Sequence, residues 1–214
     1  MLDVNIPKQN IVKRVVFATK FESDKVKGSR FIVDISPVQN IDHTKIFLEQ
    51  IAKQYPDANH HCFAYKFSDG LHRSSDAGEP RGSAGLPILQ RIETANLVDT
   101  MVIVTRYFGG VKLGVGGLIR AYGSAVSDAL VYVQTESVVA ATLLSIHGGY
   151  PDIPMIQSVI HQFSLEKHSE TYTENVQIAV VVLPHMVEKV QRELQERSAG
   201  RISGTVCGHI SKKL

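Results

Sequence analysis

The sequence predicts an α+β fold in two domains. Short β-branched and aromatic runs alternate with apolar patterns of helical spacing along the 214 residues. The first part ends in two units in which a strand, a glycine-rich loop and a helix follow one another. The remaining part predicts strand, helix, strand, strand, helix, strand. With 43% hydrophobic residues, the chain is long enough to bury one large core or two modest ones.

The first domain is expected to begin with antiparallel strands and to end with the two loop units. Its predicted strands are 14–19, 29–36, 60–67 and the near-continuous apolar run 100–107. Asp42 is expected to cap a helix that runs to about Tyr55. Pro87 predicts the start of a second helix, and apolar residues at three- and four-residue steps predict a third over 118–133.

Polar residues 134–138 are expected to separate the domains, which gives a first domain at 1–136 and a second at 137–214. The second domain has predicted strands at 140–147, 164–172, 176–183 and 201–209. One helix is expected to start after Pro151 or Pro154, and another to run from Pro184 to about Ser198. This βαββαβ order is the split, ferredoxin-like arrangement.

Composition limits the classes of function. The 23 basic and 21 acidic residues give a net charge of +2, so the whole chain has no general electrostatic attraction to nucleic acid or membrane. Cys62 and Cys207 are far apart in sequence, which predicts reduced thiols in the cytoplasm and no zinc site. The chain begins without a signal peptide pattern and has no apolar window of membrane-spanning length. A membrane partner is therefore not expected.

Two glycine-rich loops are the most informative feature of the chain. Nine of the 16 glycines lie between Ser74 and Gly123, and eight of these nine lie in runs at 76–85 and 109–117. The second run has Val115 and Gly116 where a P-loop needs Lys and Ser or Thr, and Ile119 where a Rossmann fingerprint needs its third glycine. The common nucleotide motifs are therefore missing, and no cofactor is expected.

The same loops suit an anion. Backbone N–H groups at a glycine-rich helix start attract phosphate, and the stretch between Asp99 and Asp128 contains bases but no acid. The candidate binding residues are Arg106, Lys112 and Arg120, with Arg73 and Arg81 completing the rim. The loop positions that would support them are Gly78, Glu79, Gly82, Gly85, Gly109, Gly110, Gly114, Gly116 and Gly117. The alternative is that these glycines only form tight turns and allow close packing.

An acid–base or metal site in the first loop is a weaker alternative. It would use His60, Asp76 and Glu79, because carboxylates and an imidazole are the usual components of such sites. Glu79 precedes a proline in a turn, where an acid often caps backbone N–H groups instead. No catalytic residue or metal ligand is assigned.

The composite signature resembles the IMPACT family, in its two-domain bacterial form of the YigZ type. The matching residues are His60-x-Cys62-x-Ala64, Asp76-x-Gly78-Glu79-Pro80-x-Gly82-x-Ala84-Gly85-x-Pro87, Thr105-Arg106-Tyr107-Phe108-Gly109-Gly110-x-Lys112-Leu113-Gly114-x-Gly116-Gly117-Leu118 and Arg120-Ala121-Tyr122-Gly123. Ala77 departs from the family, which often has a second aspartate there, and Ser83 replaces a common threonine.

The resemblance implies a first domain like the second domain of small-subunit ribosomal protein five and a second like the last domain of elongation factor G. It also implies a link to translation, because eukaryotic relatives act in translational control through a protein partner. We therefore expect a non-enzymatic protein that binds RNA or the ribosome. The alternatives are a phosphotransferase or hydrolase of small molecules, and a protein–protein module that exposes Tyr107, Leu113 and Val115.

Overall fold

The computed structural model describes residues 11–213, which divide into two compact units at 11–138 and 139–212. The division falls inside a long strand, β8 (Thr135–Gly148), so the polar residues expected to form a break are the start of this strand. Within the described residues, no helix has the length and apolar character needed to cross a membrane.

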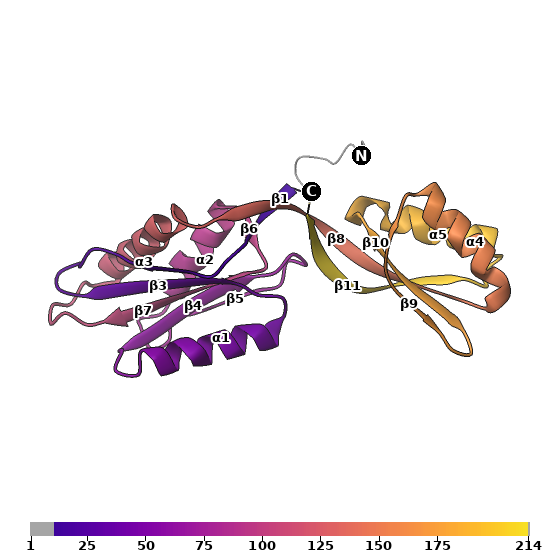
Figure 1. Ribbon diagram of the computed structural model, residues 1–214. Helices are drawn as coiled ribbons and strands as arrows, with labels where there is room; N and C mark the ends of the chain where they lie inside the picture. Colours follow the sequence, from indigo (N-terminus) through magenta and orange to yellow (C-terminus); the bar gives the residue numbers. More distant parts are fainter. Residues whose placement is uncertain (1–10, 214) are drawn as a thin grey trace. The chain divides into compact units, whose positions relative to one another are not determined.

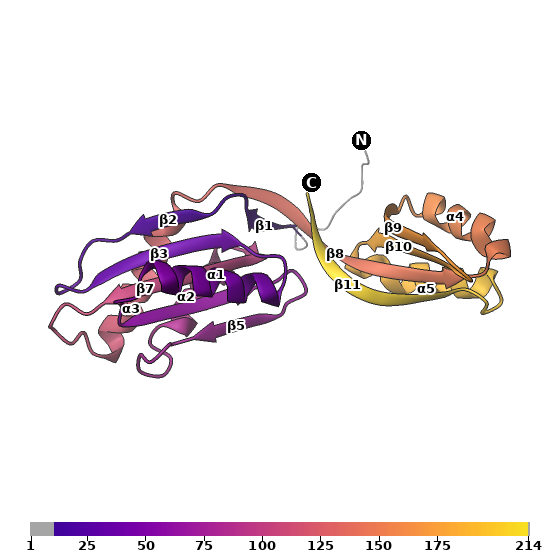
Figure 2. The same cartoon turned by 60° about the horizontal axis from the view of Figure 1, so that its bottom comes forward.

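The first unit is built on a five-stranded antiparallel sheet in the order β2-β3-β7-β4-β5 (Figure 2). Its strands are β2 (Thr19–Glu22), β3 (Arg30–Pro37), β4 (His60–Lys66), β5 (His72–Ser75) and β7 (Thr100–Tyr107). The strand β7 lies at the centre and is buried along nearly its whole length, as its apolar sequence predicts.

Helices cover both faces of this sheet (Figure 1). On one face α1 (Ile41–Gln54) packs over a core that includes Ile32, Tyr65 and Ile103. On the other face lie α2 (Gly85–Thr94) and α3 (Val115–Leu130), over a core that includes Phe31 and Val104. Alternate residues of each strand thus face different helices, which is why the strands are apolar on both sides.

The helix α1 has a different cap from the one that the sequence suggested. The side chain of Asn40 accepts a hydrogen bond from the backbone N–H of His43 at 2.9 Å, so Asn40 is the N-cap. Asp42 lies inside the first turn, where its charge still favours the helix start. The expected strand at 14–19 is divided between β1 (Ile11–Val15) and β2, and β1 pairs in parallel with β6 (Leu97–Val98).

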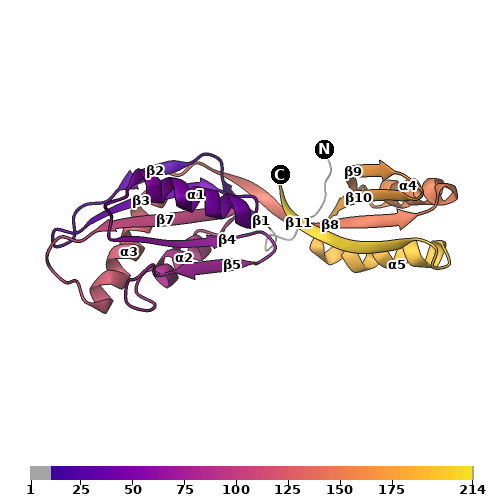
Figure 3. The same ribbon diagram turned by 90° about the horizontal axis from the view of Figure 1, so that it is seen from below.

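The second unit is ferredoxin-like. Its sheet has the order β11-β8-β10-β9, which Figure 3 shows from below, and α4 (Ile153–Gln162) and α5 (Val187–Arg197) pack on one face. The remaining strands are β9 (Glu166–Tyr172), β10 (Val176–Val182) and β11 (Ser203–Lys213). Short 3-10 turns at Tyr150–Asp152 and Pro184–Met186 precede the two helices. A separate apolar cluster that includes Leu144, Ile178 and Val190 forms its core. The α+β fold and the βαββαβ order are confirmed.

Candidate nucleic-acid interface

The two glycine-rich loops leave the first unit's sheet at the same end. Arg106, near the end of β7, lies opposite both His60 at the start of β4 and Phe31 at the start of β3. Ser75, the last residue of β5, lies opposite Phe63 of β4. We call this end the loop end: it comprises the turn 23–29, the first loop 76–84 and the second loop 108–114. The helices α2 and α3 both begin there.

Asp76 organises the first loop. Its carboxylate accepts hydrogen bonds from the backbone N–H groups of Gly82, Ala84 and Gly85 at 2.7, 2.9 and 2.9 Å. Partial burial acts to raise the pKa of Asp76, but these backbone bonds hold it below its ordinary value. The carboxylate therefore occupies the N-terminus of α2 as a built-in anion.

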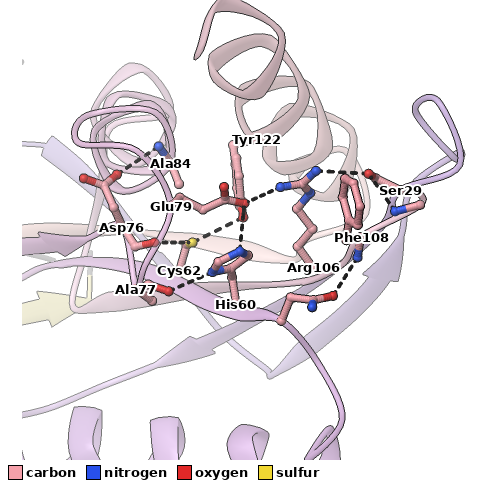
Figure 4. Close-up of polar contacts among 12 residues, drawn as sticks. Ser29, His60, Cys62, Asp76, Ala77, Glu79, Ala84, Arg106, Phe108 and Tyr122 are labelled. Carbon is pink, nitrogen blue, oxygen red and sulfur yellow. Dashed lines mark hydrogen bonds and ion pairs between the residues drawn. The ribbon is translucent and has the colours of Figure 1, made fainter. Parts of the chain in front are cut away.

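Glu79 forms a buried ion pair with Arg106 (Figure 4). The distance between its Oε1 and the Arg106 Nη1 is 2.7 Å, and the two side chains are only 4% and 5% exposed. The Tyr122 hydroxyl, from α3, donates to the same carboxylate oxygen at 2.8 Å, and Arg106 Nη2 donates to Ser29 Oγ at 3.1 Å. One carboxylate thus joins the first loop to β7 and α3.

His60 and Cys62 complete this polar cluster from β4. His60 Nδ1 lies 2.9 Å from the carbonyl oxygen of Ala77, so this nitrogen carries the proton, and Nε2 lies 3.9 Å from Glu79 Oε1. The Cys62 thiol lies 2.9 Å from the carbonyl oxygen of Asp76 and 3.2 Å from the Tyr122 hydroxyl. Burial raises the pKa of Cys62 to about 12, which keeps the thiol protonated and unreactive.

The second loop is held against the turn 23–29 by close backbone packing. A Cβ atom on Gly109 would lie 1.9 Å from the carbonyl carbon of Gly28, so only glycine fits there. The backbone N–H of Gly109 also contacts Ser29 Oγ at 3.3 Å, and that of Phe108 donates to Asn59 Oδ1 at 2.8 Å. This packing also brings exposed Lys27 of the turn next to the second loop.

The N-terminus of α3 is open to solvent. Its N-cap, Gly114, has φ +71° and supplies no side-chain hydrogen bond, and its first turn contains no acid. Gly114, Val115 and Gly116 are exposed. Lys112 and Arg120 are exposed on either side of these residues, and in the described part of the chain neither forms an ion pair. This helix start can therefore accept an anion, whereas the N-terminus of α2 is already occupied by the Asp76 carboxylate.

The structure brings only some of the predicted anion-binding residues together. Lys112 and Arg120 flank the α3 N-terminus, and exposed Arg81 lies in the first loop at the same end. Arg106 is inside the domain and neutralised by Glu79, so this placement does not offer its guanidinium to a phosphate. Arg73 pairs with Tyr65, which faces α1, and thus lies on the sheet face opposite α2 and α3.

Backbone conformation or close packing explains each predicted loop glycine except Gly116. Gly78, Gly82, Gly110 and Gly114 have positive φ angles that favour glycine, and Gly85 and Gly109 allow close backbone approach. Gly117 lies near Leu113, with 3.1 Å between a built Cβ and the Leu113 side chain. Gly116 alone of the loop positions combines a helical conformation with room for a Cβ atom, which would meet only Arg120 Nη1, in ordinary contact at 3.8 Å. Turn geometry and packing thus account for most of the run, but not for Gly116.

The suggested acid–base residues do not form a group of three. The Asp76 carboxylate is directed at the α2 N-terminus, whereas Glu79 and His60 lie in the buried cluster (Figure 4). Among residues 11–213, no set of three or more His, Cys, Asp or Glu side chains is placed to hold a metal ion. In this arrangement the three residues fix the first loop.

Sequence reasoning missed the residues that anchor the loop end. The sequence predicts Ser29 only as the first residue of a strand and gives no signal at Asn59. It places Tyr122 in the third helix and in the family signature, without a partner for its hydroxyl. A tyrosine on a buried stripe does carry a signal, because its hydroxyl needs a partner inside the core.

Comparison with known proteins gives matches along most of the chain. The Impact N-terminal domain matches residues 27–130, and a domain of unknown function, DUF1949, matches residues 146–201. An IMPACT family member of Haemophilus influenzae is 32% identical, with 94% of this chain and 96% of that protein covered. The IMPACT family member YigZ of Escherichia coli is 30% identical, with 84% and 90% covered. A solved structure, titled as that of a hypothetical protein, aligns at 27% identity with a TM-score of 0.65 over 93% of this chain and 98% of that one.

Proposed function

The chain belongs to the IMPACT family, and from that premise we propose that it is a non-enzymatic RNA-binding protein that acts at the ribosome or in the regulation of translation. The loop end would bind the phosphate backbone. Contacts of this kind position an RNA without reading its sequence.

The observation that carries the proposal is the contrast between the two helix starts at the loop end. The N-terminus of α2 is already occupied by the Asp76 carboxylate, which accepts three backbone hydrogen bonds. The N-terminus of α3 has no such group, and Lys112 and Arg120 flank it. A phosphate there would accept the free N–H groups and ion-pair with both side chains.

Gly116 supports the same conclusion. Glycine in a helix costs up to about 1 kcal/mol relative to alanine, and nothing in the fold requires it at this position. What glycine provides is access, because a Cβ atom would project next to the exposed N–H groups of the first turn. A ligand that approaches the backbone closely accounts for this residue.

A protein partner is the second candidate, and exposed apolar side chains favour it. Val111, Val115 and Ile119 are 51%, 51% and 41% exposed around the α3 start, although Leu113 and Tyr107 are half-buried. Partner capture with and without ribonuclease separates the two functions. Capture that ribonuclease abolishes supports RNA binding, and capture that survives it supports a protein interface.

The test of RNA binding is the double variant Lys112→Gln, Arg120→Gln, titrated with a fluorescent single-stranded RNA at several salt concentrations. We expect weaker binding, and a log–log salt dependence reduced by about 1.4, at about 0.7 for each lost contact to a single strand. The matched control is Lys189→Gln, Arg192→Gln, which removes two exposed charges from α5 in the other unit. Equal affinity and equal salt slope in wild type and both variants would refute the proposal.

A further inference from the structure

Phe108 is a large aromatic side chain at the surface of the loop end. It is the first residue of the second loop, and it is 47% exposed although it directly follows the buried strand β7. Exposure of single apolar residues is common, so exposure alone carries little weight. What distinguishes Phe108 is how firmly its position is fixed.

The backbone of Phe108 is held on both sides. Its own N–H donates to Asn59 Oδ1 at 2.8 Å, and Gly109 is packed against Gly28 so closely that no side chain fits between them. The ring thus extends from a rigid segment of the loop. A rigidly held ring loses little conformational entropy when a ligand binds it.

One face of the ring is supported from inside the domain. The guanidinium carbon of Arg106 lies over the ring, 5.7 Å from its centroid, and Figure 4 shows the two side chains next to each other. The same guanidinium lies 5.6 Å from the centroid of buried Phe31. Glu79 and Ser29 fix Arg106 in turn. The exposed part of Phe108 is therefore a flat apolar surface with a fixed orientation, in the same loop as exposed Lys112.

We infer that Phe108 stacks against an unpaired nucleobase, so that the loop end selects single-stranded over double-stranded RNA. The inference rests on the proposed function and specifies its ligand. Single-strand binding proteins combine aromatic platforms with basic residues that follow the backbone. The second loop carries both kinds of residue, Phe108 and Lys112, and leads directly into the α3 N-terminus. In a duplex the base faces are covered by neighbouring pairs, so the ring gains no stacking contact.

A shielding role for Phe108 predicts a different outcome. If the ring only keeps water from the Arg106–Glu79 pair, then leucine replaces it with little change in RNA affinity. Stacking requires an aromatic ring, so Phe108→Leu should lose RNA affinity whereas Phe108→Trp should keep it. The two variants separate the two roles, and measuring their melting temperatures tests whether each is folded.

The chain contains no tryptophan, which makes Phe108→Trp a direct probe. We expect a 12-nucleotide oligoadenylate to quench the fluorescence of the introduced indole, because stacking on a base quenches it. The same oligomer without bases, and the oligomer annealed to oligouridylate, should leave the fluorescence nearly unchanged. The control is Tyr132→Trp, an exposed position beyond the far end of the 16-residue helix α3, about 24 Å long. Its fluorescence should not respond.

Affinity measurements complete the test. Phe108→Leu should bind oligoadenylate about fivefold to a hundredfold more weakly than wild type, with an unchanged salt slope, and no more tightly than wild type binds the abasic oligomer. Equal affinity of Phe108→Leu and wild type, with no quenching in Phe108→Trp, would show that Phe108 does not stack on a base. If Lys112→Gln, Arg120→Gln still weakens binding in that case, the proposed RNA binding stands and only the stacking inference is wrong. If wild type binds none of the oligomers, both stacking and the proposed function are wrong.

Discussion

At the scale of single residues, Glu79 has the largest structural effect at the loop end. It is buried with Arg106, and Tyr122 donates to the same oxygen. Glu79→Gln keeps the shape but leaves a buried guanidinium without a counter-charge. We expect a loss of about 3–5 kcal/mol in the free energy of unfolding, measured by thermal or urea unfolding.

The control for this variant is Glu22→Gln, because Glu22 pairs with Arg30 at a site where both side chains are 43% exposed. It should cost no more than about 1 kcal/mol. Similar small losses in both variants would show that the buried pair does not hold the loop.

Asp34 makes the stability of the first unit depend on pH. It is buried on β3, and its Oδ2 has no hydrogen-bond partner. Burial raises the pKa of Asp34 from 3.8 to about 6, although Lys20 on the neighbouring strand acts to lower it. The folded state thus binds the proton more tightly than the unfolded state. Its contribution to stability is fully present below about pH 3.8 and is lost as pH rises to about 6.

The variant Asp34→Asn tests this dependence. The stability of the variant minus that of wild type should increase by up to about 3 kcal/mol between pH 3.5 and pH 7.5, whatever the fixed cost of the amide. Urea unfolding at both pH values measures the change. A difference that is constant with pH would contradict the burial of an ionisable Asp34.

At the scale of elements, two glycines of the second loop have opposite roles. Gly109→Ala forces a Cβ atom against the Gly28 backbone and should destabilise the fold by about 3 kcal/mol or more. Gly116→Ala has room and a helical backbone, so it should stabilise the fold by about 0.4–1 kcal/mol. Because its methyl group lies beside the free N–H groups, it should also weaken RNA binding. Unfolding experiments and RNA titrations of both variants measure these two effects. If Gly116→Ala binds RNA as tightly as wild type, then Gly116 does not serve to give a ligand access to the backbone.

Elements with strong patterns could be predicted from the sequence, and those defined by distant contacts could not. The apolar run 100–107 is a strand with the predicted bounds, and the third helix, predicted over 118–133, is present at Val115–Leu130. The strand β5 was missed, because four polar residues at a sheet edge show no alternation. Arg106 looked like a surface base at the end of a strand, because its partner Glu79 is 27 positions away and follows a different strand. The sequence therefore predicted the two loops but not the burial of Arg106 between them.

At the scale of the whole molecule, charge is nearly balanced, with a net value of +2. Under the proposed function, RNA affinity would therefore come from the local arrangement at the loop end, and we expect it to be modest and sensitive to salt. The two units have separate apolar cores, and the second carries no part of the proposed phosphate site.

The most direct test of the central claim is an NMR titration of the isotopically labelled protein with single-stranded RNA, followed at the glycine amides. We predict that the amide signals of Gly114, Gly116 and Gly117 shift with RNA concentration and return when salt is raised. The amide signals of glycines in the second unit, such as Gly149 and Gly204, should not shift. Shifts confined to residues 139–212, or no shift at the start of α3 while RNA is bound, would contradict the account.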